Sequence, residues 1–135
     1  MAATLRLEVA TPEHLLLKEQ VTQAEVPGLQ GALGVLPEHS PLLSELGCGT
    51  LTYVLENGQK KRMAICGGYV EVGPDFIRVL ANRAEAADDI DVKRAGEALQ
   101  RANERLLHPT PELDVARALN AMHRAQSRLD AAARR

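Results

Sequence analysis

The fold class of this chain is decided by residues 50–66, which read TLTYVLENGQKKRMAIC. Two runs with the composition of strands, 50–55 and 62–66, flank the dipeptide Asn57-Gly58. An Asn-Gly pair between such runs favours a tight turn, because both residues tolerate positive φ angles. The stretch therefore predicts a β-hairpin.

Short strands with turn signals continue on both sides of this hairpin. Upstream, residues 5–9 alternate apolar and charged side chains. Downstream, Gly67-Gly68 ends the hairpin, and Gly73-Pro74-Asp75 separates two further apolar segments, 69–72 and 76–81. Strands at this spacing favour an antiparallel sandwich or barrel over βαβ units.

The composition changes after the strands, where glycine becomes rare and alanine and arginine increase. The apolar period there is 3.6, which predicts helices over about 91–107 and 112–133, with Asp88, Asp89 and Asp91 as N-cap candidates. The break His108-Pro109-Thr110-Pro111 makes the pair an antiparallel helical hairpin. We therefore expect an α+β chain in the order β then α, with a β domain at 1–85 and a helical hairpin at 86–135.

The two predicted helices repeat each other. Residues 91–106 align with 114–129, and nine of the sixteen positions are identical. In each helix the arginines fall on one line and small apolar residues on another, so an antiparallel apolar seam places both arginine lines on one side. This basic face has two open interpretations, a solvated surface with pairs such as Glu97 and Arg101, or a site for a triphosphate. Because the alanine-rich seam buries little area, the hairpin is expected to be only marginally stable alone.

Composition argues against several classes of protein. The chain has 135 residues, 45% hydrophobic and 25% charged, as is typical of a soluble globular protein. It has no apolar run long enough to span a bilayer, and Glu8 interrupts the N-terminal region, so we expect a cytoplasmic chain without membrane insertion. A net charge of -2 and only three aromatic residues argue against nucleic acid as a partner. Cys48 and Cys66 are too few and too far apart in sequence for a disulfide scaffold, and we interpret both as reduced thiols.

The sequence offers no constellation for catalysis or metal binding. The four histidines lack the spacing of metal ligands. His39 precedes Ser40, but neighbours in a proline-flanked loop do not form a triad, and there is no nucleophile elbow. The glycine-rich segment 28–34 lacks the Gly-Lys-Ser/Thr ending of a phosphate loop. We expect no catalytic residue, no metal and no required cofactor.

Three separated motifs resemble a known family. They are the run GLQGALGVLPEHSPLL at 28–43, the run GGYVEV at 67–72, and Val79-Leu80-Ala81. With the total length and the order of strands before helices, they resemble the epsilon subunit of bacterial F-type ATP synthase over essentially the whole chain. The resemblance implies a flattened N-terminal β-sandwich of about ten strands followed by the helical hairpin.

The resemblance also implies a role. Members are non-catalytic rotor subunits that couple proton flow to ATP synthesis, beside the gamma subunit and the c-subunit ring, at the cytoplasmic face of the bacterial inner membrane. Their hairpin is mobile, and when it extends toward the alpha and beta subunits it inhibits ATP hydrolysis. The loop expected to contact the rotor contains Gly31, Ala32, Leu33, Gly34 and His39.

Members that bind ATP carry an Ile/Leu-Asp-x-x-Arg-Ala motif at the start of the first helix, which stands here as Ile90-Asp91-Val92-Lys93-Arg94-Ala95. The resemblance implies that ATP is a regulatory ligand and not a substrate. The implied phosphate contacts are Arg94, Arg101, Arg124 and Arg128. The implied adenine or ribose contacts are Glu85, Ile90 and Asp91. Ala95 is the remaining implied position of the site.

One alternative from another class remains, a small β-sandwich enzyme or ligand-binding module with an accessory helical hairpin. It requires a concave site lined by aromatic residues or paired carboxylates, and the chain has three aromatic residues in all.

Overall fold

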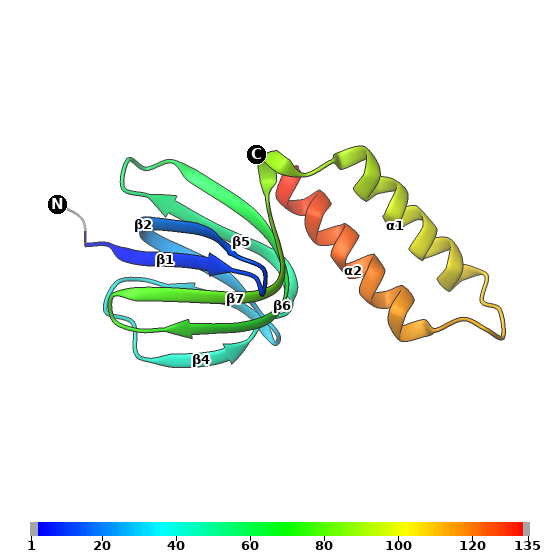
Figure 1. The fold of residues 1–135 in the computed structure, drawn as a ribbon, viewed down its shortest axis with the longest axis horizontal. Helices are drawn as coiled ribbons and strands as arrows, with labels where there is room; N and C mark the ends of the chain where they lie inside the picture. The colour runs from blue at the N-terminus through cyan, green and yellow to red at the C-terminus, as the bar shows by residue number, and fades with distance from the viewer. Residues whose placement is uncertain (1–2, 134–135) are drawn as a thin grey trace.

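The computed structural model describes residues 3–133, a β domain followed by two helices (Figure 1). The strands are β1 (Leu5–Ala10), β2 (Leu15–Gly28), β3 (Gly31–Val35), β4 (Leu42–Glu45), β5 (Cys48–Leu55), β6 (Lys60–Val72) and β7 (Phe76–Ala86). A short 3-10 helix, η1 (Ala87–Asp89), leads into the helices α1 (Val92–Leu107) and α2 (Val115–Ala132). The predicted order of strands before a helical pair is confirmed.

The strands form one sheet in the order β1-β7-β6-β5-β2-β3, with β4 paired to β6. Because β1 also pairs with β2, the sheet closes on itself, and its apolar side forms the core. The pairing of β1 with β7 is parallel, which differs from the expected all-antiparallel arrangement. The pairings β1–β2, β2–β5, β5–β6 and β6–β7 are all antiparallel, so after four reversals β7 runs in the same direction as β1 and the two meet in parallel.

The structure has seven strands where the resemblance implied about ten, because three strands are long and serve two parts of the sheet. The first half of β2 pairs with β1 and its second half with β3 and β5. The first half of β6 pairs with β5 and its end with β4. Only the first half of β7 lies beside β1. If each long strand is counted as two segments, the seven strands become ten.

The hairpin predicted at residues 50–66 is confirmed as β5 and β6. Thr50 pairs with Ala64 and Val54 with Lys60. At the turn, Gly58 has φ 87° and its N–H donates to Leu55 O at 2.9 Å, and Asn57 Oδ1 accepts from the N–H of Gln59 at 2.8 Å. The side chain of Asn57 and the free backbone of Gly58 therefore close the turn, as the dipeptide predicts.

The bend in β6 depends on Gly67-Gly68, which have φ 73° and 108°. The register with β7 shifts here, from Cys66 opposite Arg83 to Gly68 opposite Ala81. A Cβ at position 68 would collide with Leu80 O and lie 2.9 Å from Ala81 Cα. Only glycine fits this close approach of two backbones.

Gly68→Ala is expected to lower the free energy of unfolding by about 3 kcal/mol or more, since backbone strain and a steric clash add. Gly58→Ala is the matched control, because it has a positive φ but nothing within 4 Å of its Cβ position. The control should cost only about 1 kcal/mol, from strain alone. Urea unfolding monitored by circular dichroism measures both values, and equal losses would contradict the close approach.

Both helices begin at the aspartates that the internal repeat aligns. Asp91 Oδ1 accepts from the N–H of Arg94 at 3.0 Å, and Asp114 Oδ1 accepts from the N–H of Arg117 at the same distance. Each carboxylate satisfies a backbone donor that the helix leaves unpaired. The second helix was expected from about residue 112, and it begins three residues later because Asp114 is its cap.

The helices form the expected hairpin, and α2 lies between α1 and the sandwich (Figure 1). The predicted small-residue seam is confirmed, with Ala95 and Ala102 of α1 and Ala118 and Ala125 of α2 buried. The other buried face of α2 packs on β5 and β6. Its C-terminal end completes a second small core with the hinge, made by Ala64, Ala87, Ile90, Ala131 and Ala132.

The interpretation of both cysteines as reduced thiols is wrong for this structure, in which Cys48 and Cys66 form a disulfide. The two residues are direct partners in the β5–β6 ladder, with Cα atoms 3.9 Å apart. They are 18 residues apart in the sequence, but the hairpin brings them together. The disulfide lies under α2, where Ser127 Oγ is 3.7 Å from Cys48 Sγ.

Candidate functional site

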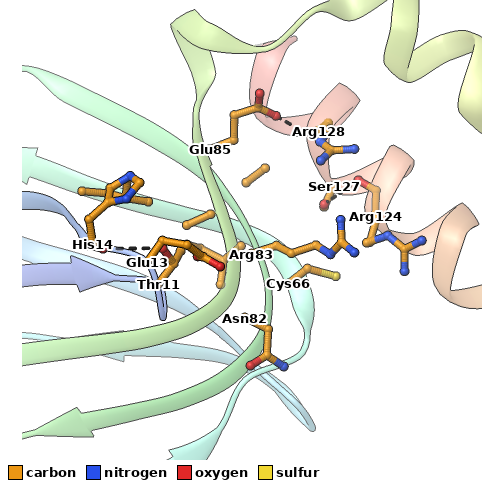
Figure 2. A pocket seen from close by; sticks show the side chains of 14 residues that line it. Thr11, Glu13, His14, Cys66, Asn82, Arg83, Glu85, Arg124, Ser127 and Arg128 are labelled. Carbon is orange, nitrogen blue, oxygen red and sulfur yellow. Dashed lines mark hydrogen bonds and ion pairs between the residues drawn. The ribbon is translucent and has the colours of Figure 1, made fainter.

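A cavity of about 480 Å³ lies between the sandwich and α2 (Figure 2). Its walls come from the β1–β2 turn, the middle of β6, the C-terminal half of β7 and one face of α2. The polar residues that line it are Thr11, Glu13, His14, Asn82, Arg83, Glu85, Arg124, Ser127 and Arg128. Because α2 supplies one wall, the cavity exists only while the hairpin is docked.

Hydrogen bonds fix the face that α2 presents to this cavity. Arg128 Nε donates to Glu85 Oε1 at 3.0 Å and so ties the helix to β7 (Figure 2). Ser127 is buried, and its hydroxyl donates to Arg124 O at 2.9 Å. Positions 124, 127 and 128 share one helical face because they are spaced by three and four residues.

The cavity has a surplus of guanidinium groups. Three arginines and two glutamates, Glu13 and Glu85, line it. Burial lowers the pKa of Arg124 from its ordinary value, and the nearby charges of Arg83, Arg128 and Arg117 lower it further. Among residues 3–133, Arg128 has an ion pair with Glu85, whereas neither Arg83 nor Arg124 has a carboxylate partner. This arrangement favours an anionic ligand.

The structure brings together three of the predicted ATP-binding residues, Glu85, Arg124 and Arg128. It does not bring Arg94 or Arg101 into the same cavity. Arg101 lines a separate surface cavity of about 390 Å³ together with Glu104, Arg105 and His108. Because α2 separates α1 from the sandwich, the single basic face expected for the hairpin is divided between two cavities.

The remaining residues of the motif at the start of α1 have structural contacts. Ile90 is 4% exposed within the hinge core, and Ala95 is 3% exposed in the helical seam. The carboxylate of Asp91 caps α1. Nucleotide contacts at these three positions stay a prediction.

The predicted rotor contact loop lies on an edge strand. Gly31, Ala32, Leu33 and Gly34 belong to β3, which pairs only with β2 among the described strands. Ala32 is exposed, and His39 lies in the following turn with Nδ1 2.6 Å from Ser40 O. The exposed Leu29 and Leu36 flank this strand. The loop is therefore accessible for contact with a partner.

Sequence reasoning missed an apolar row on the outer side of the sheet. Leu15 pairs with Ala10, Ala10 with Leu80, and Leu80 with Tyr69, so these four residues share one face across β2, β1, β7 and β6. Leu15 is 55% exposed, Tyr69 53% and Leu80 51%. The signal was present in the sequence, because Tyr69 and Leu80 interrupt the expected alternation with large apolar residues on the polar side. We call these four residues the outer row.

Two absences hold for residues 3–133, the part of the chain that the structure describes. No group of three or more histidine, cysteine, aspartate or glutamate side chains gathers there in a way that would hold a metal ion. None of the helices in this range has the length and apolar character needed to cross a membrane.

Comparison with known families matches both halves of the chain. Residues 4–87 match the model of the ATP synthase delta/epsilon chain β-sandwich domain, and residues 88–133 match that of its long α-helix domain. An ATP synthase epsilon chain from Solibacter usitatus is 50% identical over 132 residues, covering 98% of each chain. One from Moorella thermoacetica is 45% identical and covers 96% of this chain and 97% of its own.

Solved structures show the same fold. A chain in the mitochondrial ATP synthase of Euglena gracilis, determined as an OSCP/F1/c-ring assembly, aligns with a TM-score of 0.83. The alignment covers 97% of this chain and 82% of the other at 23% identity. A chain in the central stalk and c-ring of the Tetrahymena thermophila enzyme aligns with a TM-score of 0.54 at 15% identity, covering 96% of this chain and 94% of the other.

Proposed function

The chain belongs to the ATP synthase delta/epsilon family, and from this membership we propose that it is a non-catalytic rotor subunit in the central stalk of a bacterial F-type ATP synthase. In this role it couples proton flow to ATP synthesis. It lies at the cytoplasmic face of the inner membrane as a peripheral protein. The match over both domains to bacterial epsilon chains supports this proposal.

Two surfaces are proposed to hold the subunit in the rotor. The outer row supplies a contiguous apolar surface on a rigid sheet, as expected for a stable contact with the gamma subunit. The edge strand β3 and the turn at His39 are proposed to contact the c-subunit ring. Neither surface includes a residue of α1 or α2.

The outer row gives a direct test of the rotor role. Tyr69→Glu is expected to abolish co-purification with gamma from detergent-solubilised membranes, because a charge would be buried against an apolar partner. Leu107→Glu is the matched control, since Leu107 is 74% exposed but lies at the end of α1, outside the sandwich. The control should co-purify like the natural chain. Failure of the unaltered chain to recover gamma would refute the rotor assignment itself.

The hairpin is proposed to be a regulatory element that senses ATP. The observation that carries this proposal is the cavity in which Glu85 of the sandwich meets Arg124 and Arg128 of α2. A triphosphate bound there contacts both domains and so stabilises the docked state, by about 2.7 kcal/mol at a ligand concentration a hundredfold above Kd. When ATP is scarce, the hairpin is released and α2 presents its arginines to acidic surfaces of the alpha and beta subunits, which inhibits hydrolysis.

A further inference from the structure

We propose that Arg83 of β7 is a third cationic contact for the bound phosphates. We also propose that, when the cavity is empty, its charge repels Arg124 of α2 and so favours release of the hairpin from the sandwich. This inference rests on the ATP site proposed above and adds a residue and a mechanism to it. The motifs that suggested the ATP site do not include position 83.

The position of Arg83 follows from the alternation of β7. Arg83 and Glu85 are two residues apart and therefore share the face of the strand that meets α2. Figure 2 shows the side chain of Arg83 extending from β7 toward α2, on the side where Arg124 and Arg128 lie. The sandwich thus presents one anion and one cation to the arginines of the helix.

The charges on the two sides of this interface are only partly matched. Glu85 and Arg128 form an ion pair at 3.0 Å. Arg124, which is half-buried, is subject to the like charge of Arg83, and the other carboxylate of the cavity, Glu13, pairs with neither residue within the described chain. An empty docked state therefore contains repulsion between Arg83 and Arg124, and that repulsion is relieved when the helix leaves.

A bound oligophosphate reverses the effect of Arg83. With two or more negative charges between β7 and α2, Arg83 and Arg124 both donate to the ligand, which bridges the two domains. Arg83 thus opposes docking without ligand and favours it with ligand. A residue that merely packed at the interface would favour docking of the hairpin both with and without ligand. The two roles therefore predict opposite effects on docking in the absence of ligand.

The test uses the full-length chain and its Arg83→Gln variant. Titration calorimetry with ATP and with inorganic tripolyphosphate should show about tenfold weaker binding of both to the variant, as expected for the loss of one charge-assisted contact at an exposed residue. Without ligand, amide hydrogen exchange in α2 should be slower in the variant than in the natural chain. Arg83→Lys, which keeps the charge, should behave like the natural chain in the exchange measurement.

Arg105→Gln is the matched control, because it removes one positive charge from the hairpin at a residue that lines the separate cavity on α1. The affinity of this control variant for tripolyphosphate should be close to that of the natural chain. Equal binding by Arg83→Gln and the natural chain would overturn the role of Arg83 while leaving the ATP site in place. Faster α2 exchange in the empty variant would also overturn it. No binding of ATP by the natural chain would instead remove the ATP site, and the inference with it.

Discussion

Deletion of residues 113–135 is expected to raise ATP hydrolysis by the assembled enzyme several-fold at low ATP, with proton coupling left intact. The deletion removes α2, which carries Arg117, Arg124 and Arg128 and forms one wall of the cavity. At low ATP the full-length chain has a released, inhibitory hairpin, and the truncated chain has none. At saturating ATP the two activities should converge, because the ligand holds the full-length hairpin in its docked position.

The measurement is the ATPase activity of reconstituted complexes containing either chain, followed across an ATP titration. Proton pumping into vesicles, recorded in the same preparations, verifies that the truncated sandwich still occupies the rotor. Equal ATPase activities at every ATP concentration would contradict an inhibitory role for this hairpin. The chain would then keep only its structural role in the stalk.

Arg124→Ala and Arg128→Ala are each expected to weaken ATP binding by about tenfold to a hundredfold. A hydrogen bond to a charged group contributes about 1.5–3 kcal/mol, and both side chains are half-buried at the cavity. AMP should bind more weakly than ATP to the natural chain, since it has fewer charges to offer these arginines. Calorimetry on the isolated chain measures all of these affinities, and unchanged ATP binding in both variants would leave the arginines as a solvated surface.

The contribution of α1 to the same site is tested with Arg101→Ala. The resemblance to ATP-binding members predicts a loss of affinity here too, although Arg101 lies outside the cavity in this structure. Such a loss would show that α1 shifts toward the ligand. Arg105→Ala is the matched control, because Arg105 lines the same separate cavity and is not among the predicted contacts. Natural affinity in both variants would confine the site to the sandwich and α2.

Features of the fold that depend on short stretches could be predicted from the sequence. Asn57-Gly58 specifies its hairpin through side-chain and backbone properties of two residues. Each helix cap, at Asp91 and at Asp114, involves only a carboxylate and the backbone N–H three residues later. Because the contact is local, the internal repeat predicts both caps. The disulfide could also have been predicted, because the hairpin register that pairs Thr50 with Ala64 places Cys48 opposite Cys66.

Features that depend on distant contacts could not be predicted in this way. The parallel pairing of β1 with β7 joins two ends of the β domain, and no local pattern specifies it. The docking of α2 on β5 and β6 separates Arg101 from Arg124, although the repeat aligns these two residues. Arg83 belongs to no motif, and only the docked helix shows that its side chain faces other arginines (Figure 2).

The claim that ATP holds the hairpin on the sandwich is tested most directly by amide hydrogen exchange of the isolated full-length chain. ATP should slow exchange throughout α2 and in the buried hinge at Ala87 and Ile90, because these residues share one core with the end of the helix. AMP at the same concentration should have a much smaller effect. Exchange in α2 that is the same with and without saturating ATP would contradict the account.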